Sequence, residues 1–357
     1  MSGQLVGERL HGRANALNAV RLALALLVVV GHSWPLSGSP WPGGPQLAGL
    51  AVSGFFALSG YLIAQSRDRL PLLAFLRHRM ARILPAFWVC LVVVALLFAP
   101  LVTLRTREHF ELMSALDYIR GNALLFIGQW GIDSTLMRVP YPGVWNGSLW
   151  TLWYEAIAYV CAGLFLVARV RRAAPVALPA LALALCALVV VVHGPFDGGS
   201  PFTHHGLRLL ATFAAGAAMW ALRHQLRSNH LVGIACLLFA VVATFTLPPA
   251  WGYALTAAPL AYGLVWLGAT LPSGVFQTND VSYGTYVYSF PVQQVLAAFG
   301  AATLGVVGFA AVSIAATMPF AVASWFLVER PVLRRTRRRS SATAAERPSP
   351  AEVLAPR

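Results

Sequence analysis

Charged side chains are scarce in this chain. Asp, Glu, Lys and Arg together make up only 11% of its 357 residues, whereas soluble domains carry about 25%. Lysine is absent, so all 26 basic residues are arginine, and only 12 residues are acidic. Hydrophobic residues account for 58%, and apolar runs of membrane-spanning length follow one another from residue 17 to residue 328. The composition excludes an ordinary soluble domain and predicts an all-α polytopic membrane protein.

Patterns typical of metal sites and disulfide frameworks are also lacking. The chain has four cysteines, each in an apolar run and without metal-ligand spacing: Cys90, Cys161, Cys186 and Cys236. We expect them to be reduced core residues. His204 and His205 adjoin without a third ligand, so we predict no metal site.

Hydropathy divides the apolar region into about ten predicted spans. They cover residues 17–36, 47–66, 83–104, 148–168, 174–193, 207–222, 231–247, 251–271, 282–299 and 303–328. The runs near Pro248 and after Gly300 can also be divided differently, so we expect an even number close to ten. Three parts follow: a cytoplasmic N-terminal segment at 1–16, the transmembrane domain at 17–328, and a basic, disordered cytoplasmic tail at 329–357.

The positions of the arginines predict the orientation. With a cytoplasmic N-terminus, most of them fall in inner segments, including Arg169, Arg171, Arg172 and the tail, while the outer ones lie nearly all in residues 105–147. This positive-inside pattern predicts both termini in the cytoplasm of a multi-pass protein of the cell inner membrane. The net charge of +14 then reflects topology and anionic lipid, and no nucleic-acid partner is needed to explain it.

Two further expectations concern the first span and the long outer loop. No small-residue cleavage site follows the first span, so we expect an uncleaved helix. The loop 105–147 is too long for a simple connector and contains a hydrophobic patch, Ala123–Ile127. It is expected to hold a short interfacial or re-entrant helix over a cavity.

Two ionisable residues lie inside the first predicted span. Arg21 and His32 are eleven residues apart, so about 16 Å separates them along a helix axis. Holding a charge at that depth costs roughly 2.5–3.5 kcal/mol on insertion scales, which makes an ionisable residue there a functional-site hypothesis by default. The spacing places one group near each side of the membrane, so the function is expected to involve both faces.

Several short motifs occur in order along the chain. They are Asn18-Ala-Val-Arg21 followed by His32, Phe55-Phe-Ala-Leu-Ser-Gly-Tyr61, Arg79-Met-Ala-Arg82-Ile-Leu-Pro85 and Ser148-Leu-Trp-Thr-Leu-Trp-Tyr-Glu155, with a weaker C-terminal set at Ser282-Tyr-Gly-Thr-Tyr286 and Glu329-Arg-Pro331. The ordered set resembles the membrane-bound acyltransferase 3 family, O-acyltransferases that modify surface glycans and some secondary metabolites. The family often has an aspartate and a histidine where this chain has Ser53 and Ser289, but the resemblance covers nearly the whole chain.

The resemblance makes His32 the best candidate for a general base. Imidazole suits the deprotonation of an acceptor hydroxyl as it attacks a thioester, because its unperturbed pKa lies near neutrality. A covalent acyl-histidine is the variant mechanism. Glu155 lies at a similar depth in its own span, which permits a pair with His32 that would fix the tautomer. The alternative is that His32 merely bonds to Glu155 as part of the bundle.

The basic residues near the cytoplasmic side fit the phosphates of acyl-CoA. Arg79 and Arg82 are three residues apart and share a helix face, and Arg21 lies at the same end. Guanidinium forks bind phosphate bidentately, so all three are candidate CoA ligands. Arginines that flank a span are also common topology anchors. No permanently bound cofactor is expected; acyl-CoA, most simply acetyl-CoA, would be a co-substrate.

Other polar and aromatic residues of the motifs are candidates for substrate contact. Ser59 and Tyr61 would line a tunnel for the pantetheine arm, although helix packing explains them equally well. Trp150, Trp153 and Tyr154 either stack on an acceptor sugar or lie in the aromatic belt at the membrane surface.

The sequence therefore supports one main hypothesis and two rivals. The first is O-acyl transfer, most simply of acetyl, from cytoplasmic acyl-CoA to a hydroxyl of a surface glycan, lipid-linked sugar or small metabolite. The main rival is a proton-coupled secondary transporter that exports a glycan or small acid, with Arg21, His32 and Glu155 as a relay. Thioester turnover separates these two. A non-catalytic assembly factor, the third reading, predicts that His32→Ala is silent.

Overall fold

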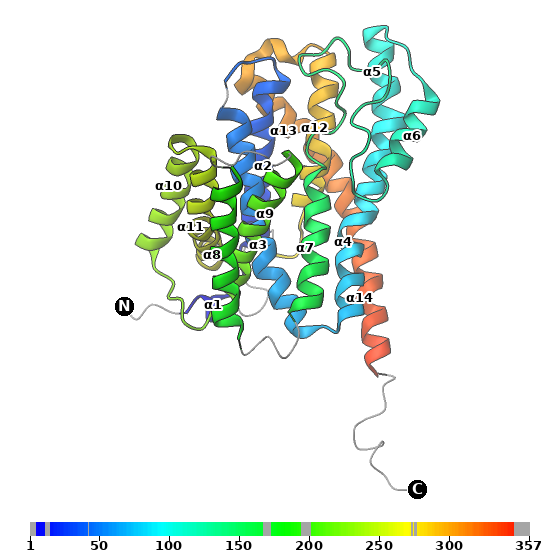
Figure 1. The fold of residues 1–357 in the computed structure, drawn as a ribbon. Coiled ribbons are helices and arrows are strands. Elements are labelled where there is room, and N and C mark those ends of the chain that lie inside the picture. The colour runs from blue at the N-terminus through cyan, green and yellow to red at the C-terminus, as the bar shows by residue number, and fades with distance from the viewer. Residues whose placement is uncertain are drawn as a thin grey trace, which may run out of the picture.

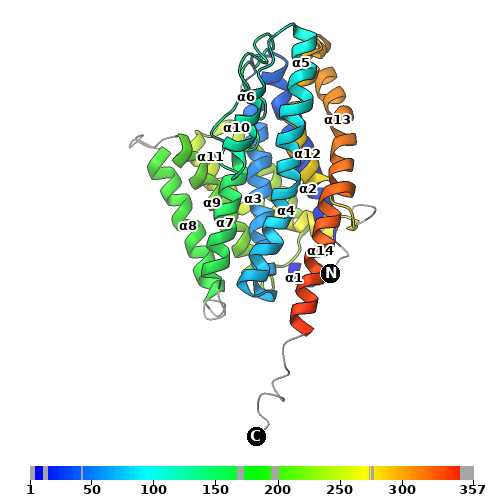
Figure 2. The same cartoon turned by 90° about the vertical axis from the view of Figure 1, so that its right-hand side faces the viewer.

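The chain folds into a bundle of long helices that run along a common direction (Figure 1 and Figure 2). The computed structural model describes residues 5–10, 15–41, 43–166, 173–193, 201–272, 274 and 277–345. Within these residues the regular structure is helical, apart from one isolated bridge between Leu5 and Arg227. The predicted all-α fold class is confirmed.

Most of the chain belongs to helices. In chain order they are α1 (Val6–Arg9), α2 (Leu17–Leu36), α3 (Gly43–Arg69), α4 (Leu72–Val93), the π-helical turn η1 (Val94–Phe98), α5 (Ala99–Thr106), α6 (Leu112–Asn122), α7 (Thr151–Phe165), α8 (Ala174–His193), α9 (Pro201–Ala221), α10 (His230–Thr246), α11 (Pro249–Thr270), α12 (Ser282–Ala298), the 3₁₀ turn η4 (Ala301–Leu304), α13 (Gly305–Ala323), the π-helical turn η5 (Ser324–Glu329) and α14 (Arg330–Ala345).

Each of the ten predicted spans contains one helix or one continuous run of helices. Within the described residues, five stretches are long and apolar enough to cross a membrane: Leu17–Leu36, Gly43–Arg69, Leu72–Thr106, Ala174–Val192 and Ala301–Arg338. Helices α7 and α10 are apolar but shorter. Apolar membrane helices are thus present, and the exact number of spans stays a prediction.

The two ends of the bundle differ in what they carry. Helices α1 and α14 lie at one end, which we call the α14 end, and α6 lies at the other, the α6 end (Figure 1 and Figure 2). Helix α6 lies in the long loop and ends just before the hydrophobic patch Ala123–Ile127; its expected interfacial or re-entrant position stays a prediction. The basic segment after residue 329 begins as helix α14, where a disordered tail was expected. Residues 346–357 and the arginines Arg169, Arg171 and Arg172 lie outside the described residues.

Helices α3 and α9 meet with their backbones in close contact. A Cβ added at Gly60 of α3 would lie 2.0 Å from the Phe213 carbonyl oxygen in α9, and one added at Gly216 of α9 would lie 1.8 Å from the Ala57 carbonyl oxygen in α3. Small residues let apolar helices approach this closely, and the resulting van der Waals contact is a main source of helix association in lipid. The glycines therefore set the distance between two helices that both carry site residues.

We expect Gly216→Val to destabilise the protein. Even its Cβ would meet the rigid backbone at Ala57, so α3 and α9 would have to separate, and overpacking of this kind costs about 1–3 kcal/mol or more. The measurement is thermal unfolding of the purified protein in detergent. Gly121→Ala is the control, since a Cβ there meets nothing nearer than 3.9 Å. Equal melting temperatures for the two variants would contradict the prediction.

Candidate active site

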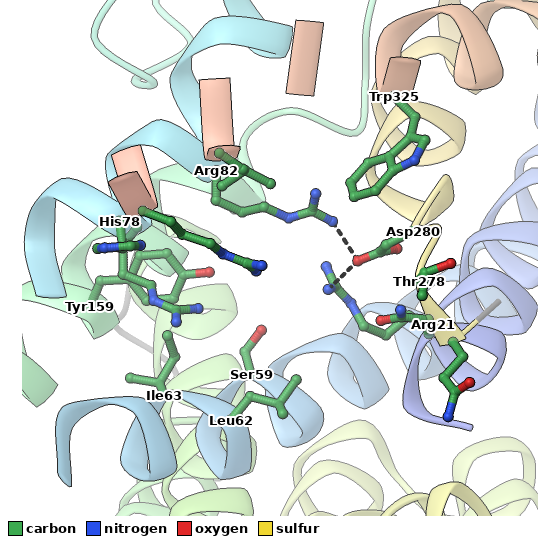
Figure 3. Close-up of a pocket in the computed structure, with 15 residues that line it drawn as sticks. Arg21, Ser59, Leu62, Ile63, His78, Arg82, Tyr159, Thr278, Asp280 and Trp325 are labelled. Carbon is green, nitrogen blue, oxygen red and sulfur yellow. Dashed lines mark hydrogen bonds and ion pairs between the residues drawn. The ribbon is translucent and has the colours of Figure 1, made fainter. Parts of the chain in front are cut away.

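A cavity of about 370 Å³ lies near the α14 end of the bundle (Figure 3). We call it the arginine cavity, because all three arginines predicted to bind CoA line it. Ser59 also lines it, whereas Tyr61 is only 1% exposed and lines none of the cavities described below. The lining residues are Asn18, Arg21, Ser59, Leu62, Ile63, His78, Arg79, Arg82, Tyr159, Gln277, Thr278, Asp280, Trp325, Leu333 and Arg337.

Two of these arginines are held by buried carboxylates. Asp280, in the loop before α12, pairs with Arg21 at 2.8 Å and with Arg82 at 2.5 Å, and Figure 3 shows its carboxylate between the two side chains. Arg82 also pairs with Glu329 at 2.8 Å. Burial alone would raise the pKa of Asp280, but the two guanidiniums and the Ser282 hydroxyl outweigh it and hold that pKa below its ordinary value. Asp280 is therefore a fixed negative charge between two positive ones.

The π-helical turn η5 positions the second carboxylate. Ser324 Oγ donates to Glu329 Oε1 at 2.9 Å across five residues, which matches the i to i+5 spacing of a π-turn. The other carboxylate oxygen of Glu329 is left to accept from Arg82. Trp325 of the same turn lies with its ring centroid 5.7 Å from the Arg82 guanidinium carbon. The turn thus holds Arg82 from two sides.

Arg79 differs from the other two arginines in having no paired carboxylate within the described part of the chain. Its Nη2 donates to Ser66 Oγ at 2.9 Å, and its buried Nε has no hydrogen-bond partner. The ring centroid of Phe75 lies 5.7 Å from its guanidinium carbon. A guanidinium with an unsatisfied N–H in a polar cavity is suited to bind an anionic group.

A narrow cavity of about 30 Å³ holds Glu155 and adjoins the arginine cavity. Arg21 and Ser59 line both. Oε1 of Glu155 accepts a hydrogen bond from Ser59 Oγ at 3.2 Å and a short one from the Tyr159 hydroxyl. Ser59, Glu155 and Tyr159 thus form one polar cluster between α3 and α7.

His32 lies in a separate cavity of about 260 Å³, which we call the histidine cavity. The possible pair between His32 and Glu155 is not made: Nδ1 of His32 is buried without a partner among the described residues, and its ring packs edge-on against Phe290, with 5.2 Å between ring centroids. Equal depth along two helices does not decide which faces meet, and Glu155 faces α3 through Ser59.

The histidine cavity also contains a cation that the motifs did not indicate. Arg208 of α9 is 6% exposed, and its guanidinium lies 4.6 Å from the ring centroid of Tyr253. The lining residues of this cavity are His32, Pro45, Gln46, Ala48, Gly49, Val52, Gly147, Ser148, Trp150, Thr151, His205, Arg208, Tyr253 and Tyr286.

The three aromatic residues predicted to bind the acceptor gather at an aromatic cavity of about 420 Å³. Trp150, Trp153 and Tyr154 line it together with Phe126, Ile127, Trp130 and His205. Phe126 packs edge-on against Trp153, with 5.6 Å between ring centroids. Two residues of the loop's hydrophobic patch therefore line this cavity, although the patch itself is not helical.

The four cavities adjoin one another through shared side chains. Arg21 and Ser59 join the arginine cavity to the narrow one, and Thr151 and Tyr286 join the narrow cavity to the histidine cavity. Trp150 and His205 then line both the histidine and the aromatic cavities. Together they form an interrupted path through the bundle. It begins at the arginine cavity near the α14 end, continues through the narrow cavity and the histidine cavity, and ends at the aromatic cavity.

Comparison with known proteins decides the family. A family model described as an acyltransferase domain matches residues 14–326. The chain belongs to the acyltransferase 3 family. It is 29% identical over 336 residues to a protein named O-acetyl transferase from Shigella phage Sf6, with 91% of this chain and 97% of the phage protein covered. It is 27% identical over 360 residues to nodulation protein 10 of Rhizobium leguminosarum bv. viciae, with 92% and 95% covered. No solved structure matches the chain.

The cavities of this acyltransferase are also lined by charged residues that the sequence motifs did not indicate. Asp280 gave no signal, because its partner Arg21 lies 259 positions away in the chain. Arg208 did give one: it interrupts an apolar run in α9, as Arg21 does in α2, and the rule that marked Arg21 applies to it equally. In the part of the chain that is described, the four cysteines are free and no cluster of three metal-ligating residues occurs.

Proposed function

We propose that this acyltransferase moves an acyl group, most simply acetyl, from acyl-CoA to a hydroxyl of a surface glycan or lipid-linked sugar. The observation that carries the proposal is the interrupted path of cavities: a cationic cavity suited to CoA at one end, His32 further along, and an aromatic cavity suited to a sugar beyond it. The phage relative's name, O-acetyl transferase, supports acetyl as the group transferred.

The donor would enter at the α14 end. Arg79 has no carboxylate partner among the described residues and would offer its guanidinium to a phosphate. Arg21 and Arg82 line the same cavity, but Asp280 already neutralises part of their charge, so we assign them to shaping the site and to longer-range attraction. The pantetheine arm would then extend past Ser59 and Glu155 toward the histidine cavity, with the narrow cavity widening to admit it.

His32 would act as the general base for the transfer. Its imidazole takes the proton of the acceptor hydroxyl while that oxygen attacks the thioester carbonyl carbon. The tetrahedral intermediate collapses with cleavage of the carbon–sulfur bond, and the proton passes from His32 to the departing CoA thiolate. Because Glu155 bonds to Ser59 and Tyr159, we place it along the path of the thioester arm and not as the partner of His32.

The orientation that fits this route has the α14 end in the cytoplasm of a multi-pass inner-membrane protein. Acyl-CoA is a cytoplasmic co-substrate, and arginines of α14 lie at that end, in keeping with the positive-inside rule. The acceptor would then be modified near the outer face, at the aromatic cavity.

Thioester turnover tests the proposal against the transporter hypothesis. The purified chain in nanodiscs, given acetyl-CoA and glycan extract from its host, should release free CoA and form a glycan O-acetyl ester in equal amounts. The ester is measured by mass spectrometry and CoA by thiol titration. Glycan movement across a vesicle without thioester cleavage would overturn the enzyme proposal in favour of the transporter.

Replacing Arg79 by glutamine should weaken acyl-CoA binding. A hydrogen bond to a charged group contributes about 1.5–3 kcal/mol, so we expect KM for acetyl-CoA to rise roughly tenfold or more while kcat changes little. Arg77→Gln is the matched control, since Arg77 is two residues away and lines no cavity described here. An unchanged KM in Arg79→Gln would show that Arg79 does not bind the donor.

A further inference from the structure

We propose that Arg208 binds an anionic group of the acceptor inside the histidine cavity, so that the acceptor carries a carboxylate or a phosphate close to the acylated hydroxyl. The inference rests on the proposed function and deepens it, because it names a chemical class for the acceptor. It is carried by the burial, the missing counter-charge and the placement of this one guanidinium.

Arg208 is a buried cation with no paired carboxylate in the part of the chain that the structure describes. Its side chain is 6% exposed in α9, no carboxylate of the described residues pairs with it, and its Nε has no hydrogen-bond partner. Burying an unpaired charge is costly in an apolar bundle. Arg21 and Arg82 avoid this cost through Asp280, whereas the described residues supply no such carboxylate to Arg208, and an anionic ligand would do so.

The guanidinium is held in one place. The ring of Tyr253 from α11 lies 4.6 Å from its central carbon, and a cation over an aromatic face is attracted to it. On another side lies Gly49 of α3, where an added Cβ would come within 3.1 Å of Nη1. Glycine at this position therefore leaves the room that the guanidinium occupies. The remaining N–H groups are left for the cavity that Arg208 lines.

This placement brings the guanidinium level with the proposed base. Gly49 follows Ala48, and Ala48 packs against Gly31, where a Cβ would lie 2.7 Å from the Ala48 backbone nitrogen. His32 is the next residue after Gly31, and it lines the same cavity as Arg208. An acceptor whose anionic group rests on Arg208 would thus hold a neighbouring hydroxyl within the cavity of His32.

The neighbouring aromatic cavity fits the rest of such an acceptor. Trp150 and His205 line both cavities, so a sugar ring stacked on Trp150 would extend its substituent toward Arg208. Guanidinium forks bind carboxylate and phosphate in the same bidentate way. Two sources share this chemistry: the carboxylate of an acidic sugar, and the pyrophosphate that joins a sugar to a lipid carrier.

Binding of two anionic probes distinguishes these sources. Binding to the wild-type protein in nanodiscs is followed by tryptophan fluorescence. Methyl glucuronoside is the carboxylate probe, with methyl glucoside as its neutral control. Inorganic pyrophosphate is the phosphate probe, with sodium chloride of equal ionic strength as its control. CoA is present throughout to fill the arginine cavity. We expect one anion to bind about tenfold more tightly than its control, as for a charge-assisted hydrogen bond, and Arg208→Gln to lose this preference. The anion preferred identifies the source.

Arg223→Gln is the matched control. Arg223 lies just beyond the other end of α9 and also stacks on an aromatic ring, 4.3 Å from the centroid of Trp220, but lines none of the four cavities. It should keep the wild-type preference. If Arg208→Gln fails to fold, Arg208→Lys keeps the buried charge without the fork, and we expect a weaker preference from it.

The anion site would be overturned if the wild type showed no preference for either anion over its control. It would also be overturned if the preference survived in Arg208→Gln or were unchanged in Arg208→Lys. A preference that disappears in Arg79→Gln instead would assign the anion to the arginine cavity. Acetyl-CoA turnover is measured on the same samples. Anion binding that depends on Arg208 in a protein without thioester turnover would refute the proposed enzyme and leave the binding site intact.

Discussion

Replacing His32 by alanine is expected to abolish acyl transfer while leaving the bundle folded. General base catalysis contributes about 10²–10⁴-fold to rate, so the loss of this imidazole should remove nearly all of the activity. The structural cost should be small, because Nδ1 of His32 has no hydrogen-bond partner among the described residues and its ring contact is an edge-on one with Phe290. The measurement is the O-acetyl ester on the host's surface glycan, by mass spectrometry, in a gene deletion that carries each variant.

The control for this experiment is His224→Ala, at an exposed histidine that lines none of the cavities. It should restore the ester as fully as the wild type at equal membrane levels. If His32→Ala also restores it, His32 is a packing residue and the proposed mechanism is wrong. If the wild type itself restores nothing, the acceptor is not that glycan, and acyl-CoA turnover by the purified protein decides between enzyme and transporter.

The features that were predictable from the sequence are those that depend on residues close together in the chain. Hydropathy located the ten apolar helical runs, because each apolar run reports only on its own stretch of chain, whereas the basic helix α14 was not predicted. The sequence predicted that Arg21, Arg79 and Arg82 lie at the same end of the bundle, because each lies in or just before the cytoplasmic end of its predicted span, 17–36 or 83–104. That Trp150, Trp153 and Tyr154 line one cavity with the loop patch was not predicted.

The relations between distant residues were not predictable. Depth along a helix says nothing about its rotation, so the sequence permitted a pair between Glu155 and His32, whereas Glu155 accepts hydrogen bonds from Ser59 and Tyr159. Asp280 is an isolated acidic residue in a connecting loop, and its role appears only when α2, α4 and α12 are assembled around it. Arg208 was visible as a charge in an apolar run, but the absence of a counter-ion for it is a property of the folded bundle.

Replacing Arg82 by glutamine should cost more stability than any other change at the arginine cavity. Removing one partner of a buried ion pair costs about 3–5 kcal/mol, since the other charge is left buried and uncompensated. Here that charge is Glu329, whose side chain is 1% exposed and, within the described part of the chain, would keep only the Ser324 hydroxyl as a partner. Asp280 retains Arg21. Thermal unfolding in detergent should therefore show a large fall in melting temperature.

Two comparisons separate this structural role from donor binding. Arg120→Gln removes an exposed pair with Asp117, in which the two side chains are 78% and 64% exposed, and pairs of this kind contribute about 0–1 kcal/mol, so its melting temperature should hardly move. The double variant Arg82→Met with Glu329→Leu removes both charges together and should recover much of the stability lost in Arg82→Gln.

If the double variant recovers stability and also full affinity for acetyl-CoA, Arg82 serves only to hold Glu329 and η5. If stability returns while KM for acetyl-CoA stays raised, the guanidinium also attracts the donor. A melting temperature of Arg82→Gln equal to that of Arg120→Gln would mean that the buried network does not stabilise the bundle.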